Sequence, residues 1–206
     1  MQNNTQICLM DINHLTLLKN TITQFVQLTD QDFERLFPHL AYLHLRKGEY
    51  WISEGKKEQQ IGFILNGNMR HYYTADGEEK TTYFYFENHL VSSYFSALTG
   101  QPSKLTIEAL TDCQLMIFPY KVLLSLYDAS HLWERFGRKL AEHLVLGLEE
   151  RMAGLLILTP EERYLQLLQE NKKKIIARIP QHLIANYLGI TPVSLSRIRR
   201  RISGKK

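Results

Sequence analysis

The chain has 206 residues, of which 44% are hydrophobic and 22% charged, as is usual for a globular protein. No apolar run reaches the roughly 20 residues that a membrane span needs, and the polar first residues do not resemble a secretory signal, so we expect a cytoplasmic protein that binds no membrane. The net charge of +4 hides an asymmetry, because residues 172–206 hold ten of the 25 basic residues and no acidic one. Such a segment suits a polyanion such as nucleic acid.

Helices and then several strands are expected in the first part of the chain. Residues 14–37 alternate apolar and polar positions at helical spacing, which predicts one or two short helices. From residue 41, short runs rich in Tyr, Phe, Ile and Thr are separated by glycine turns. The pairs Asn66-Gly67 and Asp76-Gly77 suit two-residue hairpins, so residues 61–73 are predicted to form strand, tight turn and strand. Further strands are expected at 81–86, 105–110 and 114–118, which together predict a β-sandwich or barrel.

A long helix is predicted to follow, because residues 129–156 contain no proline and large apolar residues recur at intervals of three or four. This helix would outrun a small barrel, so we expect part of its apolar stripe to pack against the same helix of a second subunit, as a parallel coiled coil. The alternative is that the rest of the monomer covers the stripe. The expected dimer interface consists of Phe136, Leu140, Leu144, Leu148, Met152 and Leu155.

A further helix is predicted to begin at Thr159, since Pro160 suits its first turn and Glu162 completes a capping box. Residues 175–179 precede Pro180 and are expected to be a short extended segment. The predicted domains are a part rich in strands at 1–128, a dimerisation helix at 129–158 and a helical domain at 159–206.

Residues 181–202 follow the local rules for two helices joined by a tight turn. Ala185 is small where the helices would cross, Gly189 permits a left-handed turn, and Thr191 can cap the second helix. In a helix-turn-helix, the outward face of that helix enters the major groove, where arginine pairs with guanine. A basic helix at a membrane surface is the alternative. The residues predicted to contact DNA are Gln181, His182, Thr191, Val193, Ser194, Ser196, Arg197, Arg199, Arg200 and Arg201.

Over nearly its whole length the chain resembles the Crp/Fnr family of bacterial regulators, and most of all its Bacteroidetes-type members. The strongest motif is Ile-Ala-Asn-Tyr-Leu-Gly-Ile-Thr-Pro-Val-Ser-Leu-Ser-Arg-Ile-Arg at 184–199. The resemblance implies an α+β fold, with a double-stranded β-roll (a jelly roll like that of cyclic nucleotide-binding domains), a long dimerisation helix and a winged helix-turn-helix. It also implies a homodimer on a palindromic operator in double-stranded DNA, with RNA polymerase and a small-molecule effector as further candidate partners.

The contacts that the family's nucleotide binders make are missing. Their Gly-Glu and Arg-Ser pairs fall on Ser92-Ser93 and Ser103-Lys104, and the Thr-Ser pair of their dimer helix falls on Gly147-Leu148. Without the arginine for the phosphate, tight binding of cyclic AMP is not expected. The effector is therefore unknown and no cofactor is expected. Ser92, Ser93, Ser103 and Lys104 are still candidates for binding another anion.

Two more departures concern the DNA-binding end. Val193 stands where many members have a glutamate that reads cytosine, so we expect a different or looser operator. The sequence stops at Lys206, shortly after the second helix, so the wing is expected to be reduced or absent.

We expect a regulator rather than an enzyme, with two alternatives. A cupin-like metal enzyme would need clustered histidines and a carboxylate, whereas His71 and His89 form no His-x-His pair, so no metal site is expected. Two distant cysteines, Cys8 and Cys113, are also too few for an iron–sulfur cluster. The second alternative is a β-roll interaction module that has lost specific DNA binding.

Overall fold

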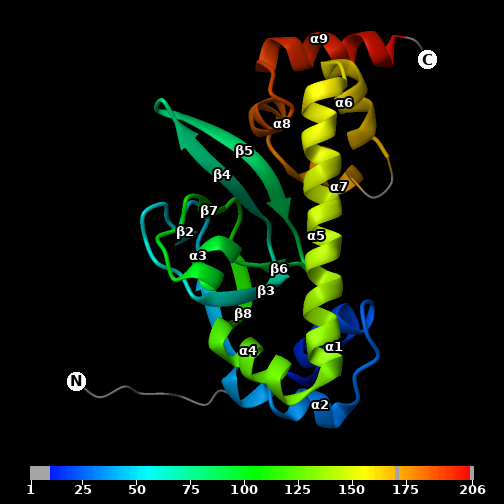
Figure 1. The fold of residues 1–206 in the computed structure, drawn as a ribbon. Helices are drawn as coiled ribbons and strands as arrows, with labels where there is room; N and C mark the ends of the chain where they lie inside the picture. The colour runs from blue at the N-terminus through cyan, green and yellow to red at the C-terminus, as the bar shows by residue number, and fades with distance from the viewer. Residues whose placement is uncertain (1–9, 170–171, 205–206) are drawn as a thin grey trace.

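The middle of the chain folds into two four-stranded antiparallel sheets that pack as a β-sandwich (Figure 1). The structure is a computed structural model that describes residues 10–169 and 172–204. One sheet has the order β1-β8-β3-β6 and the other the order β2-β7-β4-β5. The strands are β1 (Ala41–Leu45), β2 (Tyr50–Ile52), β3 (Gln60–Asn66), β4 (Met69–Ala75), β5 (Glu78–Tyr85), β6 (Leu90–Val91), β7 (Thr106–Ala109) and β8 (Cys113–Pro119).

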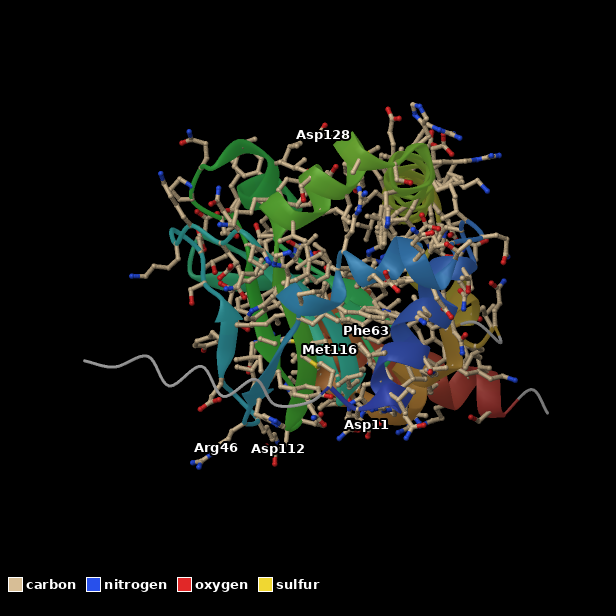
Figure 2. The ribbon with its side chains drawn as sticks, turned by 90° about the horizontal axis from the view of Figure 1, so that it is seen from below. Asp11, Arg46, Phe63, Asp112, Met116 and Asp128 are labelled. Carbon is tan, nitrogen blue, oxygen red and sulfur yellow. The ribbon has the colours of Figure 1, made fainter. Side chains whose placement is uncertain are left out.

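Alternating side chains of β3 and β8 fill two separate cores. Ile64 and Leu115 point between the sheets, where they join a cluster that includes Met69 and Ile107. Phe63 and Met116, which are register partners and lie side by side in Figure 2, point the other way, against the helices. All six of these side chains are fully buried. Burial of each large apolar side chain contributes about 1.5–3 kcal/mol to the free energy of unfolding. This sheet is therefore covered on both faces.

The turn at Asn66 and Gly67 does not join two paired strands, so the predicted hairpin over 61–73 is wrong. Strand β3 pairs with β6 and β8, whereas β4 pairs with β5 and β7. The turn carries the chain from one sheet to the other. Gly67 has a φ of 97°, and a β-carbon there would lie 2.5 Å from the carbonyl oxygen of Asp112, so glycine is required on both counts.

The Asp76-Gly77 hairpin is confirmed. The two residues have φ angles of 54° and 77° and connect β4 to β5, whose register runs from Ala75 opposite Glu78 to Met69 opposite Tyr85. Positive φ at both central positions is the backbone of a tight turn that follows the twist of the strands.

Helices cover the outer face of the first sheet. The short N-terminal helices are confirmed, while α3 and α4 were not predicted. The helices and this sheet enclose a buried apolar cluster that includes Phe33 and Trp133. The indole nitrogen of Trp133 donates a hydrogen bond of 3.1 Å to the carbonyl of Asp32. The helices are α1 (Ile12–Thr23), α2 (Asp30–Glu34), η1 (Phe37–His39), α3 (Tyr94–Thr99), α4 (Tyr120–Ala129) and α5 (His131–Ile157).

Phe136 was wrongly placed in the dimer interface. It is 2% exposed, and its ring packs edge-on against Phe25 and Trp133 inside the same protomer. Leu140, one turn later, is half-buried against the same cluster. The periodicity of the helix is real, but its first turns are anchored to the N-terminal helices and are not free for a partner.

Beyond Leu140, α5 leaves the body of the protomer. Residues 142–150 are exposed on every side, and Figure 1 shows the helix running on past the sheets toward the C-terminal helices. Four members of the predicted stripe, Leu144, Leu148, Met152 and Leu155, are between 43% and 66% exposed. Among the helices of the described part, none has the length and apolar character to cross a membrane.

Four helices form the C-terminal part: α6 (Pro160–Leu167), α7 (Lys173–Arg178), α8 (Gln181–Tyr187) and α9 (Pro192–Ser203). The capping box at the start of α6 is confirmed, with the Thr159 amide donating to Glu162 at 2.8 Å. The extended segment predicted at 175–179 is wrong, because α7 is helical. Pro180 restricts only its neighbour Ile179, which is extended at φ −98° and ψ 135°, so the helix ends just before it.

Two further expectations concern the ends of the chain. Cys8 lies outside the described residues, while Cys113 is buried. The expected reduction of the wing concerns the residues after α9, of which the structure describes only Gly204.

Candidate nucleic-acid interface

Helices α8 and α9 cross closely around Ala185, which is completely buried. Gly189 lies in the turn between them with a φ of 69°. The turn is closed by a 3.0 Å hydrogen bond from the Ile190 amide to the Ala185 carbonyl. The small residue at the crossing and the left-handed glycine therefore act as predicted.

Thr191 caps α9. Its hydroxyl accepts a hydrogen bond of 3.2 Å from the Ser194 amide, and the two hydroxyls lie 3.0 Å apart. The inner face of α9 is held by Leu195 and Ile198, which are 1% and 4% exposed, and by half-buried Ile202. These apolar contacts fix which face of α9 turns outward.

The outward face of α9 carries several of the residues predicted to contact DNA. Val193 is 61% exposed, and Ser196, Arg197 and Arg200 are also exposed. Arg199 and Ser194 are half-buried, and Arg201 forms an ion pair of 3.1 Å with Glu161 of α6. Gln181 and His182 are exposed at the start of α8. The structure thus brings all ten predicted DNA contacts onto one two-helix unit, although the Thr191 and Ser194 hydroxyls are engaged in the cap.

Of the arginines of α9, only Arg201 is held by an ion pair in the part of the chain that the structure describes. Within residues 10–169 and 172–204, Arg197, Arg199 and Arg200 make no ion pair. Arg197 also lines a groove between α9 and the first turn of α6. Three guanidinium groups are therefore free to bond to phosphate or to the edge of a guanine.

The candidate anion-binding residues of the roll do come together, but they bond to the protein itself. The hydroxyls of Ser93 and Ser103 lie 2.9 Å apart, both residues are buried, and Ser103 also donates to the Leu105 carbonyl. Ser92 donates to the Gln60 carbonyl at 3.0 Å. The ammonium of Lys104 lies over the ring of Phe95, 4.5 Å from its centre. A phosphate would have to displace these contacts.

A cluster of aromatic and imidazole rings on β4 and β5 was not predicted from the sequence. The ring of His71 contacts Tyr73 and Tyr85, and Tyr85 contacts both Tyr83 and His89. The available signal was the alternation of ring residues along each strand, since every second side chain faces the same way. Burial lowers the pKa of His71 and of His89 to about 4, so both are neutral near pH 7. Among the described residues, no group of three or more His, Cys, Asp or Glu could hold a metal ion.

Acidification is expected to destabilise the protein between pH 6.5 and about 4, because the folded state keeps these two histidines neutral. The unfolded chain binds more protons in that window, so the free energy of unfolding falls as the pH falls. His71→Phe should flatten this slope by up to one proton, about 1.4 kcal/mol per pH unit near pH 5. Urea unfolding at a series of pH values measures the slope. The control is His131→Phe at an exposed position of α5, and an unaltered slope in the His71 variant would contradict the prediction.

Comparison with known proteins shows which structures have a similar fold. Residues 42–130 match the cyclic nucleotide-binding domain family. FixK2 from Bradyrhizobium japonicum is 20% identical, with a TM-score of 0.69 over 81% of this chain and 85% of that chain. A protein from Eubacterium rectale described as a Crp/Fnr-family regulator is also 20% identical, with a TM-score of 0.68 over 90% and 88% of the two chains.

A third structure is CLP from Xanthomonas campestris, described as a global regulator responsive to c-di-GMP. It is 16% identical, with a TM-score of 0.66 over 86% of this chain and 93% of that chain. A search of curated proteins gave no match to the sequence. Residues 42–130 are therefore similar to the cyclic nucleotide-binding domain family, and the chain has the fold of Crp/Fnr regulators: a β-sandwich, a long helix and C-terminal helices.

Proposed function

We propose that this chain, which has the fold of the Crp/Fnr regulators, is a cytoplasmic transcription regulator that binds DNA as a homodimer and catalyses no reaction. The observation that carries the proposal is the outward face of α9, where Arg197 and Arg200 are exposed and free of ion pairs in the described structure. That face belongs to a capped helix whose inner side is buried against α8. A rigid helix with unpaired arginines is what major-groove recognition requires.

In this proposal α9 lies in the major groove. Arg197 pairs with a guanine, while Val193 and Ser196 contact neighbouring base edges or a thymine methyl group. Arg199, Arg200 and Arg201, with Gln181 and His182 at the start of α8, contact phosphates and fix the position of the helix. The division of residues 1–128, 129–158 and 159–206 into sensor, dimerisation helix and DNA-binding domain is part of the same proposal.

The dimer would form along α5. Leu144, Leu148, Met152 and Leu155 follow one another at intervals of three or four residues and are exposed, so they make one apolar stripe. A second copy of the same helix would bury this stripe and place the two α9 helices about one DNA turn apart, roughly 34 Å, as a palindromic operator requires.

The cyclic nucleotide-binding domain of this chain would not respond to cyclic AMP. The Ser93 and Ser103 hydroxyls are hydrogen-bonded to each other. Ser103 and Lys104 occupy the positions at which the family's nucleotide binders have the arginine that binds phosphate. An effector of another chemistry, and RNA polymerase, would be the remaining partners of such a regulator.

Selection of binding sites from random duplex DNA, followed by a mobility-shift titration, tests the function. We expect a palindromic consensus with a dissociation constant on the order of 10⁻⁸ M or tighter, and no change in affinity when cyclic AMP is added. If binding is uniform across sequences, specific regulation is excluded and the interaction module becomes the better explanation. A large gain with cyclic AMP would contradict only the effector part.

A further inference from the structure

The helix-turn-helix is packed on the outer face of the second sheet of its own protomer. Phe84 of β5 and Phe86, which directly follows this strand, belong to the same buried cluster as Leu183 and Ile184 of α8. Figure 1 shows α8 beside the β4–β5 hairpin. The ring of Phe84 contacts that of Tyr187 at 5.3 Å between centres. The apolar contact holds the two parts together but does not by itself fix their orientation, because apolar contact is not directional.

Asn186 supplies the first directional contact. Its side-chain oxygen accepts a hydrogen bond of 2.7 Å from the Thr81 amide, and its side-chain nitrogen donates one of 2.8 Å to the Glu79 carbonyl. Strand β5 is at the edge of its sheet, so these backbone groups have no neighbouring strand to pair with. One amide side chain of the helix-turn-helix thus takes the place of a strand partner.

Arg178, in the last turn of α7, supplies the second. Its guanidinium donates to both carboxylate oxygens of Glu87, at 2.5 and 2.7 Å, and to the side-chain oxygen of Asn68 at 3.0 Å. Glu87 also accepts from the Gly67 amide at 3.1 Å. These hydrogen bonds, above all those from Arg178, lower the pKa of Glu87 to about 2. A fork-shaped guanidinium on a carboxylate fixes direction as well as distance.

The long helix holds α8 from another side. The guanidinium of Arg151, on α5, stacks 3.6 Å from the centre of the Tyr187 ring and donates to the carbonyl of the same residue. The first helix of the helix-turn-helix is therefore tied both to the roll and to the helix through which we propose that the protein dimerises.

Strand β5 connects this contact to the inside of the roll. Successive side chains of a strand point to opposite faces. Phe84 faces the helix-turn-helix cluster, whereas Tyr85 packs against the core between the sheets and contacts the rings of His71 and His89. A shift of β5 caused by a change inside the roll would therefore move the groups that Asn186 and the phenyl rings contact.

We propose that the Arg178–Glu87–Asn68 contact and the Asn186 clamp on β5 form one latch that holds the helix-turn-helix in its DNA-binding orientation. Opening the latch is the conformational step through which the roll lowers DNA affinity. The first part concerns the protein alone, and only the second part rests on the proposed function. The recognition face of α9 is exposed in the latched state, so the latch prearranges the protein for binding.

Hydrogen exchange of the Thr81 amide in full-length Glu87→Gln protein tests the latch. The Thr81 amide donates to Asn186 and not to Glu87. A substitution at Glu87 can therefore change the exchange rate of Thr81 only if the two contacts of the latch open together. We expect at least a severalfold faster exchange at Thr81. Glu78→Gln is the matched control, because this exposed carboxylate lies on the same hairpin and pairs with Lys80, and it should leave Thr81 unchanged. Arg178→Lys, which keeps the charge but loses the fork, should also accelerate exchange.

The outcomes separate the latch from the proposed function. Unchanged exchange at Thr81 in both the Glu87 and the Arg178 variants overturns the latch. If exchange rises and operator affinity falls about five- to tenfold in Glu87→Gln, both parts stand. Faster exchange with unaltered operator affinity overturns the switch. If the native protein binds no specific DNA but exchange rises in the variants, the latch stands and the proposed function fails.

Discussion

Replacing Leu148 with glutamate is expected to convert the proposed dimer into a monomer. Leu148 is 66% exposed in the protomer and lies in the middle of the stripe formed with Leu144, Met152 and Leu155. A dimer would lose two buried leucines, about 3–6 kcal/mol in total, and would bring two carboxylates together. The dissociation constant should rise roughly 10²- to 10⁴-fold, and sedimentation velocity across a concentration series measures it. Because the protomer does not bury Leu148, its thermal unfolding should change little.

Leu146→Glu is the matched control for this experiment. Leu146 is 65% exposed, almost as much as Leu148, but two residues along a helix turn it about 200° away. It should leave the dimer intact. Phe136 is unsuitable as a test, since it is buried in the protomer core and its replacement would destabilise the protomer itself. If the native chain is already monomeric at micromolar concentration, or if both glutamate variants behave alike, the stripe is not the interface.

The helix-turn-helix could be predicted because its determinants are local. The cap at Thr191, the left-handed Gly189 and the small Ala185 act within a few residues of one another. The β4–β5 hairpin was predictable for the same reason, as Asp76-Gly77 determines its own backbone. Each of these elements follows from rules that need no knowledge of the rest of the chain.

Features that depend on distant partners could not be predicted in this way. The turn at Asn66-Gly67 has hairpin chemistry, yet the strands beside it pair with β8 and β7, about 50 and 40 residues further along the chain. Phe136 has the same helical spacing as Leu148, and only the position of the N-terminal helices decides that it is buried. The latch contacts join residues 91 to 110 positions apart. The spacing of apolar residues predicts that one face of a helix is apolar, but it does not show which part of the protein covers that face.

Arg197→Ala is expected to remove the discrimination between bases at one position of each half-site of the operator. Arg197 is exposed on the outward face of α9 and makes no ion pair in the part of the chain that the structure describes. A bidentate arginine–guanine contact is worth about 1–3 kcal/mol of discrimination, and a homodimer makes two of them, so operator affinity should fall roughly 30- to 10⁴-fold. Affinity for unrelated DNA should fall much less. Titrations with operator and random duplexes at one salt concentration measure both.

Arg199→Ala is the matched control, since it removes the same side chain two residues further on, at a half-buried position on the flank of α9. A phosphate contact there would weaken binding to all sequences alike and reduce the slope of log K against log salt by about one for each protomer of the dimer. Arg197→Ala, by contrast, should change the preferred base at one position of each half-site while the protein still dimerises. If the two variants lose affinity equally for operator and random DNA, Arg197 contributes only its positive charge, and the contacts to bases must come from another part of α9. If neither variant matters, α9 does not enter the groove.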